Sequence, residues 1–185
     1  MKRRAVLAGL LALVLGGAAA PPTAWVVIRE ASTIELTVRA LGGSHRGLFD
    51  DWRGDIVFDP AAPERTRATV LVQAASLRMR SSALTRRARS SSLLDTARHP
   101  VVRFELGSLR PLGGGRYTAR AEVTIKGRTR PVTFPVDLRV TGDRAHLAGA
   151  FTLDRTEFGI GTTGAWNRIL GREVTVRVSL QARRA

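Results

Sequence analysis

The chain has 185 residues, no cysteine and a formal net charge of +15. Without cysteine, the protein has no disulfides, no metal–thiolate site, no thiol catalysis and no lipidation at a signal-peptide cysteine. The excess of basic residues favours anionic partners such as phospholipid headgroups. No nucleic-acid partner is expected, because the arginines are not interleaved with the aromatic residues on which bases stack.

The first twenty residues have the order of an export signal: a basic start at Lys2–Arg4, an apolar run at Ala5–Leu15 and small residues at Gly16–Ala20. The apolar run is too short to span a bilayer as a helix. We therefore expect a cleaved signal peptide over residues 1–20, with an uncleaved anchor as the alternative. The remaining residues, 21–185, are expected to form one domain in the periplasm or elsewhere outside the cytoplasm.

Nine later segments are predicted to be strands, most of them because apolar and polar residues alternate with a period of two. They are Trp25–Ile28, Ile34–Arg39, Phe49–Phe58, Ala68–Ala74, Val101–Leu106, Tyr117–Ile125, Val132–Val140, Ala145–Leu153 and Glu173–Ala182. Glycines at 42, 43 and 47 interrupt the pattern before the third segment. Most turns contain Gly, Pro or Asp, which favours a closed antiparallel barrel or a sandwich. A barrel of about eight strands either fills with its own side chains or encloses one small ligand, and the pattern leaves both open.

Residues 76–100 differ from the rest, because they are rich in Ser and Arg and do not alternate. A short helix is predicted around Ser82–Ala88, and a second helical segment after Ser92, whose side chain could cap it. We expect a helical crossover in this insertion. Its arginines would face an anionic lipid or a pyrophosphate headgroup at the barrel mouth, or else form a solvated charged surface.

No catalytic or metal site is expected. His45, His99 and His146 lie far apart and do not have the spacing of metal ligands. The chain has no Gly-x-Ser-x-Gly motif, and nothing in the pattern places a base beside a nucleophile. Asp154 and Arg155 are interpreted as a surface pair or a turn brace. No cofactor is expected beyond a bound lipid.

Six segments, taken in order, resemble the YceI family of exported, lipocalin-like barrels associated with polyisoprenoid binding. They are His45–Phe49, Trp52–Ile56, His99–Phe104, Val123–Val132, Leu153–Gly161 and Glu173–Val174. The resemblance implies an all-β fold: an extended antiparallel, lipocalin-like β-barrel of about eight strands with a short helical insertion. It also implies an apolar lumen that takes the tail of an isoprenoid lipid, of the quinone or polyprenyl phosphate type.

The chain departs from the family at polar positions. Relatives often have His where Ala31 and Lys126 stand, and an Arg-Asp-x-His-Leu stretch where this chain has Leu84–Ala88. At ~0.8 kcal/mol per methylene, a tail of roughly fifteen carbons supplies about 10 kcal/mol before the costs of association. We therefore expect lipid binding to be retained while headgroup selectivity differs.

Two groups of residues are the candidate site. Apolar residues predicted to face the lumen are Leu36, Val38, Leu84, Leu93, Leu94, Val102, Phe104, Val123, Ile125, Phe134, Val136, Leu138, Phe151 and Phe158. The headgroup candidates are Arg86, Arg87 and Arg89. For any one apolar residue, ordinary core packing is the alternative to ligand contact.

The leading hypothesis is a non-enzymatic protein that binds and sequesters an isoprenoid lipid outside the cytoplasm. The alternative is a ligand-free structural or interaction module, fully packed inside, that docks on the cell envelope through its basic surface. The expected partners are an isoprenoid lipid and, in either case, an anionic membrane surface. Pairing of two barrels into a homodimer is left open.

Overall fold

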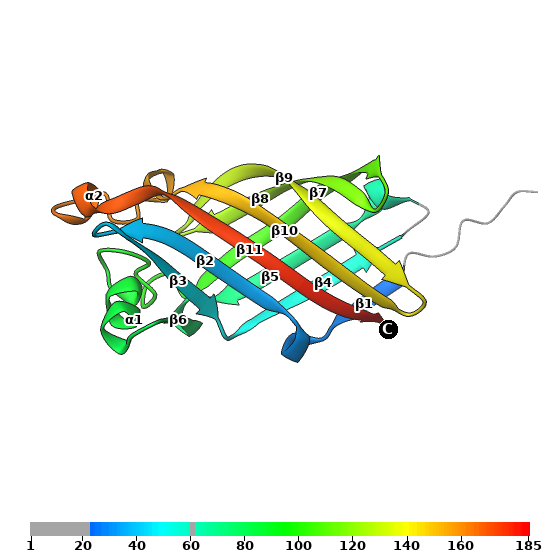
Figure 1. The fold of residues 1–185 in the computed structure, drawn as a ribbon, viewed down its shortest axis with the longest axis horizontal. Coiled ribbons are helices and arrows are strands. Elements are labelled where there is room, and N and C mark those ends of the chain that lie inside the picture. Colours follow the sequence, from blue (N-terminus) through cyan, green and yellow to red (C-terminus); the bar gives the residue numbers. More distant parts are fainter. Residues whose placement is uncertain (1–22, 60–61) are drawn as a thin grey trace, which may run out of the picture.

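The computed structural model describes residues 23–59 and 62–185 (Figure 1). Over these residues it has eleven strands: β1 (Thr23–Val27), β2 (Thr33–Ala40), β3 (Gly43–Phe49), β4 (Trp52–Phe58), β5 (Arg67–Gln73), β6 (Leu77–Met79), β7 (Val101–Gly113), β8 (Arg116–Ile125), β9 (Arg128–Thr141), β10 (Arg144–Asp154) and β11 (Leu170–Arg184). Two helices, α1 (Ser82–Arg89) and α2 (Trp166–Ile169), and four 3-10 turns, η1 (Arg29–Ala31), η2 (Pro63–Arg65), η3 (Ala74–Ser76) and η4 (Arg155–Phe158), complete it. The predicted signal peptide lies outside the described residues and stays a prediction.

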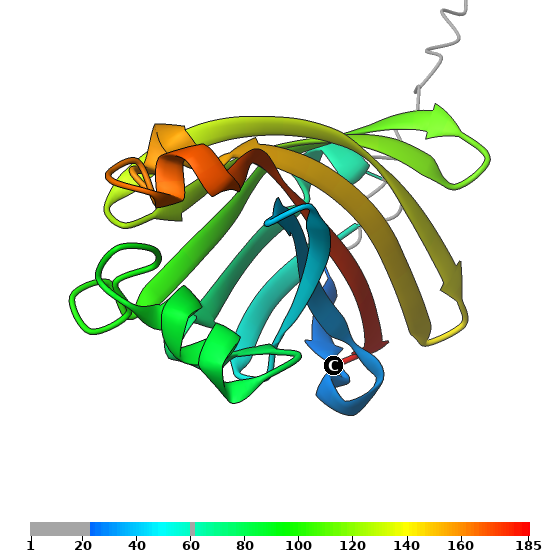
Figure 2. The ribbon, with the colours of Figure 1, turned by 60° about the vertical axis from the view of Figure 1, so that its left-hand side comes forward.

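The eleven strands form one closed antiparallel barrel with eight strand positions, which we call staves. Three of these positions are each occupied by two shorter strands that lie end to end. β1 pairs with β4 while β2 pairs with β3, so β1 and β2 lie end to end beside β4 and β3. In the same way β5 pairs with β4 and β6 pairs with β3. From β5 the order runs through β7, β8, β9 and β10 to β11, which pairs with both β2 and β1. The predicted eight-stranded lipocalin-like barrel is confirmed (Figure 2).

Salt bridges brace the interruption between β3 and β4. Arg78 donates Nε and Nη2 to the carboxylate of Asp50, at 2.7 and 2.9 Å. Arg29 donates to the Asp50 carbonyl at 2.7 Å and to the Asp51 carboxylate at 3.3 Å, and its guanidinium lies over the Trp52 ring. These contacts hold the bend that lets two short strands act as one stave.

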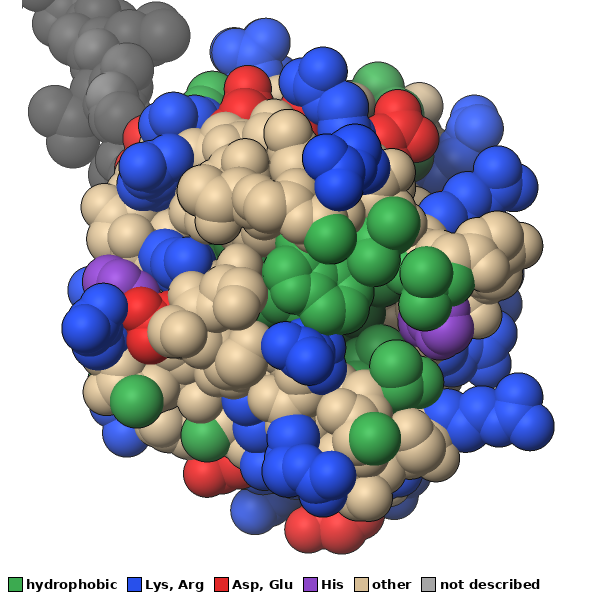
Figure 3. All heavy atoms as spheres, turned by 90° about the vertical axis from the view of Figure 1, so that its left-hand side faces the viewer, with side chains coloured by type: hydrophobic (Ala, Val, Ile, Leu, Met, Phe, Trp, Pro, Cys, Tyr) green, Lys and Arg blue, Asp and Glu red, His purple; other side chains and the backbone are tan. Residues whose placement is uncertain are grey.

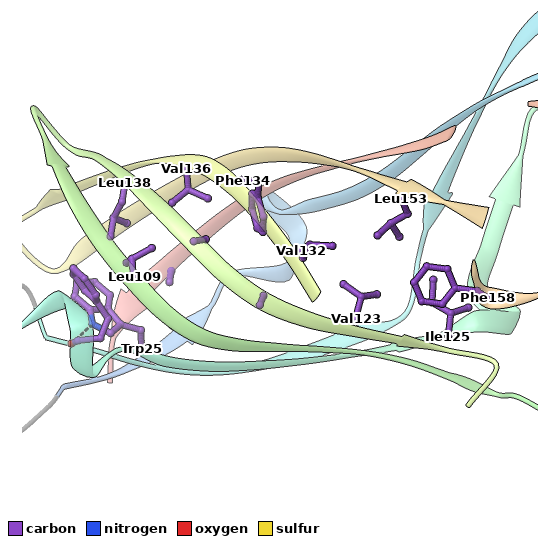
Figure 4. Close-up of a cluster of buried hydrophobic side chains, with 14 residues drawn as sticks. Trp25, Leu109, Val123, Ile125, Val132, Phe134, Val136, Leu138, Leu153 and Phe158 are labelled. Atoms are coloured by element: carbon purple, nitrogen blue, oxygen red, sulfur yellow. Dashed lines mark hydrogen bonds between the residues drawn. The ribbon is translucent and has the colours of Figure 1, made fainter. Parts of the chain in front are cut away.

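Inward-facing residues of alternate strand positions form the core (Figure 4). Trp25, Leu109 and Leu138 lie at one end of this cluster, and Ile125 and Phe158 at the other. At the first end, Trp25 Nε1 donates to the Phe58 carbonyl at 3.3 Å, and their rings pack with centroids 6.3 Å apart. This aromatic pair helps to close the end of the barrel that lies away from α1 and α2 (Figure 1).

The structure departs from the sequence predictions in several elements. The predicted strand Phe49–Phe58 is interrupted at Asp50 and Asp51, and β6 was not expected, because it lies in the segment assigned to a helical crossover. Strand β3 was not expected, because its glycines hide the alternation. Gly47 lets β6 pack closely against β3, since a Cβ at this position would lie 2.6 Å from Met79 Sδ. The helical segment predicted after Ser92 is wrong: residues 91–98 form turns. Helix α2 was not predicted. None of the helices in the described part of the chain is long and apolar enough to cross a bilayer.

Candidate ligand cavity in the barrel

The barrel encloses a cavity of about 260 Å³. A single water needs only about 10–15 Å³, so the lumen is not a solid core. All eight staves contribute to its wall, and only Thr66 and Arg155 among the lining residues are polar. Thr66 Oγ1 has no hydrogen-bond partner within the described residues and lies in a buried side chain. Such a wall suits a long apolar ligand with few polar groups.

Thirteen of the fourteen predicted lumen residues line this cavity. They are Leu36, Val38, Leu93, Leu94, Val102, Phe104, Val123, Ile125, Phe134, Val136, Leu138, Phe151 and Phe158. Leu84 differs: it lies on α1 and is not part of the lining, whereas Ala88, one turn later, is. Contact of any of these residues with a ligand stays a prediction.

The residues that line the cavity differ in how much accessible surface they keep. On β8 and β9 the lining side chains are buried by their neighbours; Val123 and Val136, for example, are each 3% exposed. On β2 and β11 the lining residues Leu36, Val38 and Val176 keep accessible surface although they point inward. At these three positions the protein's own side chains leave apolar surface inside the barrel uncovered.

Three phenylalanines from different strands meet inside the lumen. The rings of Phe134 and Phe151 have centroids 4.8 Å apart, and each lies 6.2 Å from Phe104. Gly149 allows this packing, since a Cβ there would lie 2.8 Å from Val136 Cγ1 and 3.3 Å from Phe134 Cε2. The cluster gives one wall of the lumen an aromatic surface.

One end of the barrel is formed by loops and short helices, and we call it the mouth: the β2–β3 turn with residues 39–43, the insertion with residues 79–99, and the segment 159–170 (Figures 1 and 2). Hydrogen bonds connect its parts: Gly161 N donates to the Ser92 carbonyl at 3.0 Å, and Leu41 N to the Ile169 carbonyl at 3.3 Å. Leu93, Leu94 and Ile160 of the mouth line the cavity. The mouth therefore covers the end of the lumen.

A buried arginine organises the mouth. Arg155 is 1% exposed, and its guanidinium donates to five backbone carbonyls. The acceptors and distances are Gly171 at 2.9 Å, Ile160 at 2.7 Å, Gly161 at 2.9 Å, Asn167 at 3.4 Å and Leu170 at 2.7 Å. Burial lowers the pKa of Arg155 from its usual range, and the nearby Asp154 charge opposes this. With all five donors in use, Arg155 shapes segment 159–171 and is not a ligand for a headgroup.

Lys126 ties two parts of the mouth together. It lies in the β8–β9 turn with φ of 51°, and its Nζ donates to the carbonyls of Leu93 at 3.0 Å and Gly159 at 3.2 Å. The insertion and the η4 loop are thus held to the same ammonium group. This position carries one of the family departures noted above, and the structure gives its lysine a bracing role.

The three headgroup candidates have different surroundings. Arg89 donates Nε and Nη2 to the Leu77 carbonyl, at 3.0 and 2.7 Å, and so braces β6. The Arg87 guanidinium lies 5.1 Å from the centre of the Trp166 ring, bridging α1 and α2. Arg86 is exposed, without a hydrogen bond or ion pair within the described part of the chain. Arg86 and Arg87 remain the candidates best placed to meet a headgroup at the mouth.

Asp154, beside the mouth, has structural contacts. Asp154 accepts from the Thr156 hydroxyl at 2.6 Å and from the Arg172 guanidinium at 2.5 Å, which lowers its pKa to about 2. Residues 23–59 and 62–185 contain no group of three His, Asp or Glu side chains that could hold a metal ion. Asp154 and Arg155 do not pair with each other, but both brace turns, as the sequence suggested.

A closed, eight-stranded antiparallel barrel with an apolar lumen places the protein among the lipocalin-like barrels. Residues 25–182 match the YceI-like domain, so the chain belongs to the YceI family. The predicted family resemblance is confirmed.

Curated relatives and solved structures agree with this assignment. The UPF0312 protein of Pseudomonas syringae pv. tomato is 27% identical over 77% of this chain and 78% of its own length, and that of Vibrio cholerae 25% identical over 89% and 92%. Burkholderia cenocepacia BcnA superposes with a TM-score of 0.79 at 24% identity, covering 84% of this chain and 98% of BcnA. A polyisoprenoid binding domain from Saccharophagus degradans gives 0.69 at 14% identity, covering 88% and 99%. These likenesses to solved structures show a shared fold.

Proposed function

We propose that the protein binds an isoprenoid lipid and carries it without chemical change, with the tail inside the barrel. The observation that carries this proposal is the cavity of about 260 Å³ with its almost wholly apolar wall. An apolar chain in this space would cover surface on Leu36, Val38 and Val176 that the protein leaves accessible. Burial of each methylene contributes about 0.8 kcal/mol, so a long tail is favoured over a short one.

The fold relationship supports the class of ligand. The Saccharophagus degradans domain, which shares this fold, is a polyisoprenoid binding domain. At 14% identity the comparison carries no residue roles, so the ligand class rests on the lumen of this chain as well. The alternative of a ligand-free module required a barrel filled by its own side chains, and the cavity argues against it.

The headgroup would lie at the mouth, beside Arg86 and Arg87. These guanidiniums have no carboxylate partner among the described residues, so an anionic head such as a polyprenyl phosphate would be favoured there over a neutral quinone ring. Arg155 would influence such a head only through its charge, because its donors are taken up by carbonyls.

We place this activity outside the cytoplasm, periplasmic in a cell with two membranes. The support is the order of residues 1–20, with its basic start and short apolar run. Lipid carriage of this kind is useful where the ligand has to leave one membrane surface and cross water.

Solvent extraction tests the proposal directly. The purified protein is extracted with organic solvent and the extract is examined by mass spectrometry. We expect an isoprenoid lipid in stoichiometric amount. A clean extract, combined with no uptake of an added fluorescent apolar probe, would contradict the proposal.

A matched pair of variants locates the binding space. Val176→Phe adds a ring to the lumen where surface is free, and Thr175→Phe adds the same ring to the outer face of β11. Val176→Phe is expected to reduce probe uptake by about tenfold, because the ring occupies space that a tail would otherwise fill. Thr175→Phe should bind like the parent protein. Equal binding by both folded variants would place the probe elsewhere.

A further inference from the structure

Leu41 is an exposed leucine in a turn with an unusual backbone conformation. It is 73% exposed at the tip of the β2–β3 turn, and its φ is 50°. A positive φ is uncommon for leucine, and with Gly42 at 77° the turn has a geometry for which Asn-Gly is preferred. Neither local conformation nor core packing therefore explains a leucine here.

Three segments of the mouth, one of which contains Leu41, are rich in arginine. Residues 39–43, 79–91 and 162–170 of the mouth together contain six arginines and no Asp or Glu. The arginines are Arg39, Arg80, Arg86, Arg87, Arg89 and Arg168. Only Arg87 and Arg89 have a contact with another group in the described chain; the other four are exposed without an ion pair.

Most acids near this end already have basic partners. Asp95 lies 3.8 Å from Arg98, and Glu157 lies 3.9 Å from Arg130. Asp154 pairs with Arg172. Glu173, on the outer face of β11, is the acid near α2 that has no ion pair among the described residues. The charge of the mouth is therefore positive and not locally neutralised.

The apolar and basic residues occupy one face. The Leu41 amide reaches the Ile169 carbonyl at 3.3 Å, and Arg87 of α1 stacks on Trp166 of α2. Figure 3 looks onto this face: hydrophobic side chains are exposed near its middle, and basic side chains are spaced around them. An exposed apolar centre within a basic rim is the pattern of a surface that rests on a bilayer.

We infer that the mouth docks on the surface of an anionic lipid bilayer, with Leu41 entering the headgroup layer and the rim arginines facing phosphates. Trp166 suits the same interface, where Trp is enriched. This inference rests on the proposed function, because it would bring the mouth, which covers the end of the lumen, against the membrane that holds the ligand. The occupant is a bilayer surface, and its recognition is electrostatic as well as apolar.

Co-sedimentation with vesicles tests the docking. Vesicles of phosphatidylcholine with added phosphatidylglycerol are compared with phosphatidylcholine alone, and binding is expected only to the anionic vesicles. The double variant Arg39→Gln/Arg168→Gln should weaken partitioning by about 25-fold, at roughly fivefold for each charge. Arg139→Gln/Arg144→Gln removes the same charge from the opposite end of the barrel and should change it by about twofold or less.

Leu41→Asn tests the apolar part. Asn tolerates the positive φ, so the turn keeps its geometry while the apolar tip is lost. We expect about tenfold weaker partitioning, the lower end of what burial of a leucine supplies. Equal losses in the two arginine double variants, or unchanged binding by Leu41→Asn, would overturn the inference.

Probe uptake measured without vesicles separates this inference from the proposed function. Leu41, Arg39 and Arg168 lie outside the cavity lining, so their variants should load the probe like the parent protein. If these variants load the probe normally and bind vesicles as well as the parent protein does, the docking inference is contradicted and the carrier proposal is unaffected. Failure of the parent protein to load the probe would contradict the carrier proposal itself.

Discussion

Two neighbouring residues at the junction of β10 and η4 have different structural roles. Asp154 lies on the outer side, where it bonds Thr156 and Arg172. Arg155 lies on the inner side, where it is buried against carbonyls. Because the two side chains point in opposite directions where the strand passes into the turn, the acid and the base stabilise different segments.

Asp154 should make stability depend on pH. Its pKa is lowered from 3.8 to about 2, chiefly by the Thr156 hydroxyl and next by Arg172, so its ionised form favours the folded state above about pH 4. That contribution is lost as the pH falls through about 2. Asp154→Asn should lower the free energy of unfolding at pH 7 by about 1 kcal/mol, since the side chain is 28% exposed and partly screened.

Urea denaturation of both proteins at a series of pH values checks this. The difference between them should shrink between pH 4 and pH 2. A difference that is constant over this range would show that the carboxylate charge is not its source.

Among the elements, those of the mouth depend on side-chain contacts more than on strand ladders. The insertion that contains α1 contacts the η4 loop through Lys126, which donates to Leu93 and Gly159. The φ values of 51° and 71° at Lys126 and Gly127 suit Asn-Gly better than Lys-Gly. The lysine is therefore explained by its two hydrogen bonds and not by the turn.

Lys126→Asn is expected to release the insertion while leaving the barrel folded. Asn fits the turn, but it cannot reach the two carbonyls that Lys126 Nζ bonds. Amide hydrogen exchange in residues 90–99 should become roughly tenfold faster, since about 1.5 kcal/mol of local contacts is lost. Exchange in β8 and β9 should stay the same; unchanged exchange in the insertion would mean that Lys126 does not hold it.

The long strands and helix α1 could be predicted from the sequence, but the hydrogen bonds that organise the mouth could not. Alternation such as that of Val174, Val176 and Val178 against their polar neighbours reports one buried face directly. It predicted most of the strands and ten of the residues that line the cavity, whereas the choice of a barrel over a sandwich came from the family resemblance. The five carbonyls that accept hydrogen bonds from Arg155 leave no periodic signal in the sequence. They are backbone groups of residues 160–171, and every residue type has a backbone carbonyl. The same holds for Lys126, whose two partners lie 33 residues away, one on either side.

At the scale of the whole molecule, the cavity means that the protein alone does not fill its own interior. A ligand that binds only the folded state adds stability in proportion to the logarithm of its concentration over Kd. Ligand occupancy and folding stability are therefore coupled through the lumen.

Removal of the lipid should lower the melting temperature. At a concentration about a thousand times Kd, a ligand adds about 4 kcal/mol, which corresponds to roughly 10 °C for a barrel of this size. Calorimetry before and after extraction, followed by re-addition of the extracted lipid, measures the effect. Val176→Phe provides the control, because its filled lumen should show a smaller difference. Identical melting temperatures for the extracted and untreated protein would mean that nothing had occupied the lumen.

The barrel is closed by its last strand: β11 ends beside β1, with Arg184 opposite Trp25, although nearly the whole described chain lies between them. Pairings of such long sequence separation are slow to form. Until this one forms, the inner faces of the other staves lie open along their length. Under the proposed function, a lipid present during folding would then reach the lumen wall from the side, without passing through the mouth.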